Sequence, residues 1–145
     1  MPRYFTRDEA LQILPRIERL LREAIHFKSE LQEADHDLQA VKRRINAMGG
    51  VQVKHREVLD LRARREASIT SLKGIVERIH DTGCQVKDLD QGLVDFPTLY
   101  KEEEVLLCWK LGETGIEHWH GLEEGFRGRK PIDAEFLNNH RGGEE

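Results

Sequence analysis

The sequence predicts an α+β protein, in which a long antiparallel helical hairpin with a coiled-coil seam is followed by a small antiparallel β-sheet of three to four strands. Two observations predict this fold. Apolar residues recur at alternating steps of four and three through the first half of the chain, and no aromatic residue lies between Lys28 and Asp95. From Gly83 onward the chain consists of short β-branched and aromatic runs between turns, and nine of the twelve glycines lie there.

Three regions follow from this change: a kinked helical hairpin over 1–83, a small sheet packed on the hairpin base over 84–132, and a C-terminal tail over 133–145. The tail has the composition of a mobile chain end. Charged residues make up 34% of the 145 residues and aromatic residues only 6%, which is typical of long solvated helices. The net charge of −4 excludes a generally basic nucleic-acid binder.

Localisation follows from what the chain lacks. No apolar run approaches the roughly 20 residues that a membrane span needs, and the N-terminus has no apolar stretch of the signal-peptide kind. We therefore expect a soluble cytoplasmic protein. Cys84 and Cys108 belong to no CxxC pair, so we expect buried free thiols.

The first helix is expected to begin near Arg7. Thr6 and Glu9 have the spacing of a capping box, in which each side chain accepts a hydrogen bond from the backbone N–H of the other residue. Pro15 does not fit an unbroken helix interior, so we expect a kink there. The apolar seam of this helix consists of Ile13, Ile17, Leu20, Ala24, Phe27, Leu31, Ala34, Leu38, Val41, Ile45 and Met48.

The second helix should run back antiparallel to the first, because Gly49 and Gly50 interrupt the pattern and favour a short turn. Its pattern contains one extra residue near Arg65, which would shift the supercoil locally. Gly83 provides a C-terminal stop. The second seam consists of Val58, Leu61, Arg65, Ile69, Leu72, Val76 and Ile79.

The predicted strands cover 84–88, 93–96, 105–111 and 116–120. Pro97 should end the second strand or mark an edge, because it cannot donate to a strand ladder. A turn at Glu113 and Thr114 would place Lys110 opposite Glu117, Trp109 opposite His118 and Cys108 opposite Trp119. The two histidines, His118 and His120, would then share the face of Trp109, and the Cys108 thiol would point the other way.

A metal site is one alternative for this region. Two histidines two residues apart on a strand could share a divalent metal ion. The predicted register turns Cys108 away, so a Cys/His zinc site is disfavoured and oxygen ligands would have to come from acidic residues. A lone HxH pair is more often structural, and both tryptophans fit a sheet core. The candidate ligands are His118, His120, Glu113 and Asp95, with Asp88 as a further oxygen donor.

A second alternative is nucleic-acid binding, with RNA as the partner, through the tip of the hairpin. Eight basic and three acidic residues lie between Ala40 and Glu66, which gives the tip a net charge of +5 on an acidic chain. A solvated helix surface is the plainer interpretation, because no aromatic residue is interleaved to stack on bases. The basic residues are Lys42, Arg43, Arg44, Lys54, Arg56, Arg62, Arg64 and Arg65.

The blocks GLVDFP, LCWKLGE, WH and GFRGRKPI, together with the opening YFTRDEALQILP, resemble the prokaryotic domain-of-unknown-function family DUF2203 over nearly the whole chain. The family has no established activity, cofactor or catalytic residue, so the resemblance implies only which residues lie in its motif blocks. These are Gly92, Asp95, Phe96, Pro97, Cys108, Trp109, Gly112, Glu113, Trp119, His120, Gly128 and Arg129.

The sequence favours a non-catalytic interaction or scaffold module, because a long helical hairpin on a small sheet presents surface to a protein partner or to a second copy. The metal-binding or metal-dependent hydrolytic site around His118 and His120 stays open beside it. No nucleophile motif, P-loop or dinucleotide fingerprint accompanies the acidic residues. We therefore expect no enzyme and assign no catalytic residue.

Overall fold

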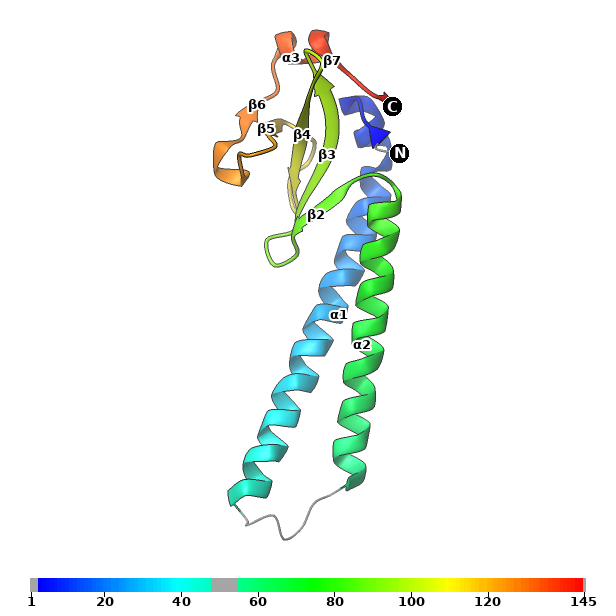
Figure 1. Cartoon of the computed structure of the whole chain (residues 1–145), viewed down its shortest axis with the longest axis vertical. Helices are drawn as coiled ribbons and strands as arrows, with labels where there is room; N and C mark the ends of the chain where they lie inside the picture. The colour runs from blue at the N-terminus through cyan, green and yellow to red at the C-terminus, as the bar shows by residue number, and fades with distance from the viewer. Residues whose placement is uncertain (1–2, 48–54, 145) are drawn as a thin grey trace. The chain divides into compact units, whose positions relative to one another are not determined.

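The computed structural model describes residues 3–47 and 55–144 (Figure 1). It confirms the predicted α+β class: two long contacting helices are followed by an antiparallel sheet. The chain divides into two compact units, one formed by Met1–Leu21 with Val76–Glu145 and the other by Arg22–Ile75. The predicted interhelical turn at Gly49 and Gly50, the seam residue Met48 and the basic residue Lys54 lie outside the described residues.

Helix α1 spans Arg7–Ala47 and begins at the predicted capping box. The Glu9 N–H donates to Thr6 Oγ1 at 3.1 Å, and the Thr6 N–H donates to Glu9 Oε1 at 2.9 Å. Pro15 lies inside α1, which continues on both sides of it. Helix α2 spans His55–Asp81 and stops before Gly83, whose φ of 103° is in the left-handed region, as predicted for a C-terminal stop. No described helix is long and apolar enough to cross a membrane.

In the unit of residues 22–75, the helices contact along the predicted seam of α1. Every seam residue from Ala24 to Ile45 is buried or half-buried. Leu38 and Val41 form an apolar cluster with Leu61 of α2. Two ion pairs join the helices beside it, Arg65 to Asp35 at 2.6 Å and Arg44 to Glu57 at 2.9 Å.

The seam of α2 differs from the predicted one. Leu61 and Ile79 are buried as predicted, but between them the buried residues are Ser68 and Ile75, at 6% and 7% exposure, whereas Ile69 and Val76 are only half-buried. With Ser68 and Ile75 in place, the steps of four and three continue without an interruption, so the extra residue near Arg65 was wrongly predicted. The prediction placed an apolar residue at almost every seam position and therefore chose Ile69 over Ser68. The small polar side chain of Ser68 is nevertheless the one that is buried.

The other unit contains a six-stranded antiparallel sheet in the order β2-β3-β4-β5-β6, with β7 pairing with β3, and a two-stranded sheet of β1 and β8. The four predicted strands are present as β2 to β5, and the others are two residues long. The strands are β1 (Arg3–Tyr4), β2 (Gln85–Asp88), β3 (Leu93–Tyr100), β4 (Glu103–Lys110), β5 (His118–Gly121), β6 (Lys130–Pro131), β7 (His140–Arg141) and β8 (Gly143–Glu144).

We predicted that Pro97 either ends the second strand or marks a sheet edge. The first alternative is wrong, because β3 continues through Pro97 to Tyr100. Pro97 pairs with Leu106 of β4, and its carbonyl accepts the Phe5 N–H at 2.7 Å on the side away from β4. Its nitrogen therefore also faces away from β4, so the missing N–H removes no bond from the β3·β4 ladder. Strand β2 pairs with residues 93–95 of β3 and β7 with residues 99 and 100, so Pro97 lies at an edge between them, as the alternative predicted.

The β4·β5 register is shifted by one residue from the predicted one. Cys108 pairs with His118, Leu107 with Trp119 and Leu106 with His120. The link between these strands is a loop over 111–117 rather than a two-residue turn. In this loop the Glu113 carboxylate accepts the Lys110 N–H at 2.6 Å, and its carbonyl accepts the Trp109 indole N–H at 3.1 Å.

The register decides which side chains share a face. Because side chains alternate along a strand, a shift by one residue moves both histidines and Trp119 to the opposite faces from those predicted. One face of β3 and β4 carries Val94, Phe96, Leu107 and Trp109, all with almost no exposure. Phe5 covers this face edge-on, with its ring centroid 5.5 Å from that of Phe96.

The residues predicted as a mobile tail are part of the folded unit. Helix α3 (Ala134–Asn139) is capped by Asp133, whose carboxylate accepts the Phe136 N–H at 2.8 Å. Phe136 is 1% exposed and stacks on Tyr100 and Trp119, with ring centroids 4.7 Å and 5.0 Å away. The prediction of a mobile tail was wrong because most residues of this segment are polar, and the prediction gave no weight to Phe136, the aromatic residue that anchors the segment.

Candidate metal centre

Three adjacent strands bring together Asp95 of β3, Cys108 of β4 and His120 of β5. Asp95 pairs directly with Cys108, and His120 lies one row away on the same face, opposite Leu106. All three are buried, at 1%, 1% and 4% exposure. A carboxylate oxygen, the thiol sulfur and an imidazole nitrogen all lie within 4.8 Å of one another, which is a spacing that could hold a metal ion.

The hydrogen bonds of His120 determine which ring nitrogen can act as a ligand. Its Nδ1 lies 2.9 Å from the Gly121 carbonyl oxygen, which can only accept, so this nitrogen must carry a proton. In the neutral ring the other nitrogen, Nε2, then has a free lone pair. That lone pair faces the Asp95 carboxylate, whose oxygens lie 3.2 Å and 3.1 Å away. Two acceptors facing each other require either a proton or a cation between them.

The protonation of the group depends on its burial. Burial raises the pKa of Asp95, although His120 works against that rise. Burial and the neighbouring Asp95 carboxylate raise the pKa of Cys108 to about 12. The Asp95 Oδ2 atom is buried and makes no hydrogen bond within the described part of the chain, despite its closeness to His120. Such an unsatisfied buried oxygen is costly unless a further group, such as a metal ion, completes its coordination.

The donor set suits a transition metal. Sulfur, imidazole nitrogen and carboxylate oxygen are the three ligand types of zinc, and a tetrahedral ion separates its donors by about 3.3–3.6 Å. The observed spacing therefore needs adjustments of about 1 Å. The His120 Nδ1–H bonded to a backbone carbonyl is also the usual support of a metal-bound histidine.

A pocket of about 220 Å³ opens beside the three donors. The donors contribute to its wall together with apolar side chains from the sheet and from the segment after β5. Its lining consists of Lys87, Leu93, Asp95, Leu106, Cys108, His120, Leu122, Glu124, Gly125 and Phe126. A metal ion held by the three donors would therefore keep a position open to the pocket.

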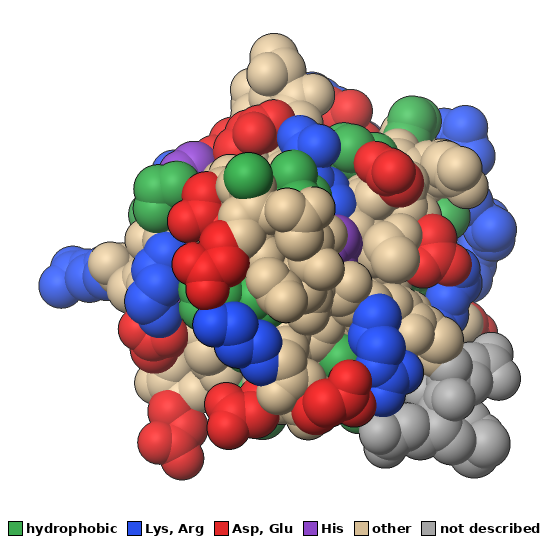
Figure 2. All heavy atoms as spheres, turned by 90° about the horizontal axis from the view of Figure 1, so that it is seen from above, with side chains coloured by type: hydrophobic (Ala, Val, Ile, Leu, Met, Phe, Trp, Pro, Cys, Tyr) green, Lys and Arg blue, Asp and Glu red, His purple; other side chains and the backbone are tan. Residues whose placement is uncertain are grey.

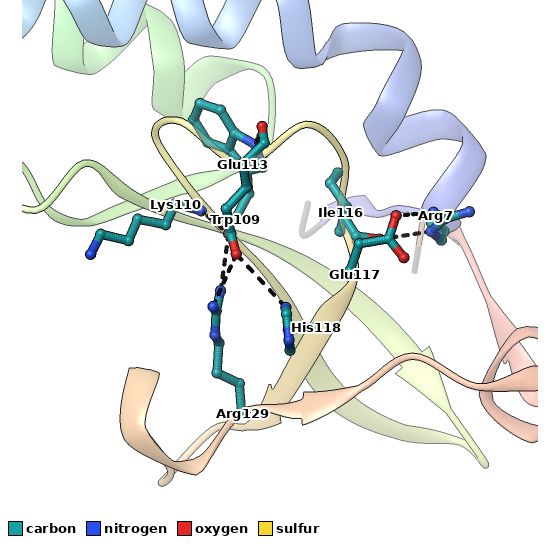
Figure 3. Close-up of polar contacts among 8 residues, drawn as sticks. All are labelled: Arg7, Trp109, Lys110, Glu113, Ile116, Glu117, His118 and Arg129. Atoms are coloured by element: carbon teal, nitrogen blue, oxygen red, sulfur yellow. Dashed lines mark hydrogen bonds and ion pairs between the residues drawn. The ribbon is translucent and has the colours of Figure 1, made fainter.

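Glu113 and His118, the other two predicted ligands, form a separate contact (Figure 3). The Glu113 carboxylate accepts two hydrogen bonds from the Arg129 guanidinium, at 3.0 Å and 2.9 Å, and lies 3.8 Å from His118 Nδ1. Burial opposes the shift, but Arg129 and the Lys110 N–H hold the pKa of Glu113 below its usual value. The Glu113 carboxylate thus interacts with Arg129 and the Lys110 N–H and lies outside the group of Asp95, Cys108 and His120.

The same arginine connects this contact to the metal centre. Arg129 also hydrogen-bonds the Cys108 sulfur, which opposes the rise in the pKa of that thiol. In Figure 3 its side chain reaches the Glu113 carboxylate from the segment before β6. Arg7, on the first turn of α1, fixes the far end of the same loop by donating to the Ile116 carbonyl at 2.7 Å and to Glu117 at 2.9 Å.

The sequence analysis named Asp95 and His120, two of the three members of this buried group, and left out Cys108. The wrong register excluded it, although the motif resemblance had marked Asp95, Cys108, His120 and Arg129 together. Asp88, the further oxygen donor that the sequence offered, lies outside this group, and its carboxylate accepts the Gln91 N–H at 3.1 Å within the β2–β3 turn. The signal that could have found Cys108 is its direct pairing with Asp95 across β3 and β4.

The basic residues of the predicted nucleic-acid tip belong to the other unit. Arg44 of α1 forms an ion pair with Glu57 of α2, and Arg65 of α2 forms one with Asp35 of α1. The remaining described ones are exposed and form no ion pair with another described residue: Lys42, Arg43, Arg56, Arg62 and Arg64. On the face of the molecule seen in Figure 2, by contrast, acidic and basic side chains are interspersed.

The fold and the buried group define an α+β protein with a three-donor candidate metal site in its sheet. The chain belongs to the family described as uncharacterized conserved protein (DUF2203), whose model matches residues 3–132. That range includes all three donors and the pocket lining. No curated protein and no solved structure matches the chain.

Proposed function

We propose that this protein binds one divalent transition-metal ion, with zinc as the preferred ion, through Asp95, Cys108 and His120. The observation that carries the proposal is the orientation of His120. Its Nδ1–H is held by the Gly121 carbonyl, so its Nε2 lone pair is directed at the Asp95 carboxylate beside a buried thiol. A cation between these atoms removes the conflict.

Two metal-free arrangements would also remove the conflict, and both are costly. A buried imidazolium–carboxylate pair loses hydration on both groups, at several kcal/mol each. A protonated Asp95 could donate to Nε2, but its second oxygen would then have only the weak thiol donor of Cys108. A divalent ion with one carboxylate, one thiolate and one neutral imidazole gives a site with no net charge, which suits burial better.

The donor set also selects among metals. A thiolate ligand disfavours the hard cations magnesium and calcium, which take oxygen ligands. Structural zinc sites usually have four protein ligands, whereas sites with three keep a position for water or another ligand. Three donors beside a pocket therefore support a site of the second kind. A metal-dependent hydrolytic role, if present, would use that fourth position.

The test is metal analysis of untagged protein, purified without chelator or added metal, followed by titration with zinc and cobalt. We expect about one equivalent of metal per chain, and cobalt absorption bands that indicate a sulfur ligand. His120→Ala and Cys108→Ser should each weaken zinc binding at least 100-fold.

The matched controls are His118→Ala and Cys84→Ser. His118 lies on the same strand and face as His120, and Cys84 is the other buried free cysteine, so both variants should keep the metal. Far-UV circular dichroism verifies that all four variants fold. No zinc uptake at micromolar concentrations by the folded parent protein, or equal loss in His118→Ala, would contradict the proposal.

A second proposal concerns the helical unit and keeps the interaction role expected from the sequence. Leu59 on α2 is 62% exposed, which is unusual for a large apolar side chain. The exposed basic residues Arg43, Arg56 and Arg64 lie on the same two helices. A partner with negative charge, such as structured RNA, would be complementary to these exposed arginines.

A further inference from the structure

The pocket beside the metal centre has a mostly apolar wall. Leu93 and Leu106 come from the sheet, and Leu122 and Phe126 come from the segment that follows β5. Its volume of about 220 Å³ is below the usual range of about 300–1,000 Å³ for pockets that hold drug-sized ligands. A matching ligand is therefore small, with a short apolar body.

The charged groups around the pocket favour an anion. Glu124 also lines it, but its carboxylate is engaged by Lys130 at 2.6 Å and by the Gly121 N–H at 2.9 Å. Lys87 is exposed, forms no ion pair with another described residue, and interacts electrostatically with Asp95. When a divalent ion is held by Asp95 and Cys108, the negative charge of both ligands is neutralised, and Lys87 then remains as an uncompensated positive charge.

We infer that the metal-loaded pocket binds a small monocarboxylate with a short apolar body. This inference rests on the proposed metal site and names the ligand class that the site would take. One carboxylate oxygen occupies the open position of the metal, Lys87 attracts the negative charge, and the body packs against Leu93, Leu106 and Leu122. A ligand of this kind satisfies the metal, the lysine and the apolar wall together.

Three probes separate these contributions in titration calorimetry with zinc-loaded protein. Hexanoate has the charged head and an apolar body, hexanamide has the same shape without the charge, and acetate has the head without the body. We expect hexanoate to bind at least tenfold more tightly than either of the other two. Zinc-free protein should bind hexanoate at least tenfold more weakly than zinc-loaded protein.

A pair of lysine variants tests the role of the pocket charge. Lys87→Met should weaken hexanoate binding about three- to tenfold while the zinc content stays at one equivalent. Lys110→Met is the matched control, because Lys110 also lies beside Phe126, at 5.3 Å from its ring, but does not line the pocket. It should leave hexanoate binding unchanged.

The outcomes distinguish the two proposals. Protein that loads one zinc but binds hexanoate and hexanamide alike, or binds neither, overturns the carboxylate inference and leaves the metal site intact. Equal binding of hexanoate with and without zinc also overturns it, because the metal then plays no part. Folded protein that takes up no zinc contradicts the metal site itself, and the inference fails with it.

Discussion

Raising the pH should destabilise the metal-free protein through Cys108. Burial, together with the Asp95 carboxylate, raises the pKa of this thiol to about 12, against an ordinary value of 9.0. The folded state therefore holds the proton to a higher pH than the unfolded state does. Stability that comes from the neutral buried thiol is fully present below pH 9 and is lost as the pH rises from 9 towards 12.

The size of the loss follows from the two pKa values. At pH 10 most unfolded chains have lost this proton, whereas nearly all folded chains keep it. Each pH unit in this window contributes about 1.4 kcal/mol, so the free energy of unfolding should fall by about 1.4 kcal/mol between pH 7.5 and pH 10 because of this one thiol. Zinc has to displace the same proton, so its affinity should fall about tenfold for each unit by which the pH is lowered.

The assay is urea unfolding of chelator-treated protein at pH 7.5 and pH 10. Cys84 is also buried with a raised pKa, so all proteins carry Cys84→Ser to remove its contribution. The comparison is between Cys84→Ser and the double variant that adds Cys108→Ala. The difference in unfolding free energy between them should shrink by about 1.4 kcal/mol at pH 10. A difference that stays constant within about 0.3 kcal/mol would refute the raised pKa, since at that size the thiol would ionise alike in both states.

Three further predictions concern other parts of the molecule. Phe136→Ala should lower the free energy of unfolding by about 3–5 kcal/mol in urea titrations, whereas exposed Leu137→Ala should cost about 0.5 kcal/mol; equal effects would contradict an anchoring role. Arg129→Met should weaken zinc binding about 10- to 100-fold with one equivalent still bound at saturation, and unchanged affinity would exclude its support of Cys108. Arg43→Glu combined with Arg64→Glu should abolish salt-dependent binding of an RNA hairpin, measured by fluorescence anisotropy, and binding that persists would exclude these residues as the contact.

Local signals were sufficient for the start and the seam of α1 and for the end of α2. The capping box of Thr6 and Glu9 involves residues three apart, and both of its hydrogen bonds form as expected. The end of α2 could be predicted from Gly83, because glycine adopts a positive φ without a steric penalty and a positive φ ends a helix. The seam of α1 could be predicted because its apolar residues recur at helical spacing and therefore lie on one face of the helix.

Features that depend on distant partners could not be predicted in this way. Ser68 occupies a buried seam position although its side chain is polar, and its own sequence neighbourhood does not indicate this burial. Phe136 becomes the anchor of α3 only because Tyr100 and Trp119 present their rings to it from β3 and β5. Strand β3 can contain Pro97 because the proline nitrogen faces a gap between β2 and β7. The position of this gap is known only when the pairing of the neighbouring strands is known.

The candidate metal site depends on a single unpredicted distance along the chain, the length of the loop between β4 and β5. The segment from Gly112 to Gly115 has the composition of a tight turn, and a tight turn there would leave Cys108 facing away from His120. Instead, Glu113 binds the Lys110 N–H and the Arg129 guanidinium, and its carbonyl binds the Trp109 indole. These contacts hold the loop against the end of β4, and β5 begins only at His118. The observed β4·β5 register places the His120 nitrogen on the same face as the Asp95 oxygens and the Cys108 sulfur, which the predicted register would have prevented.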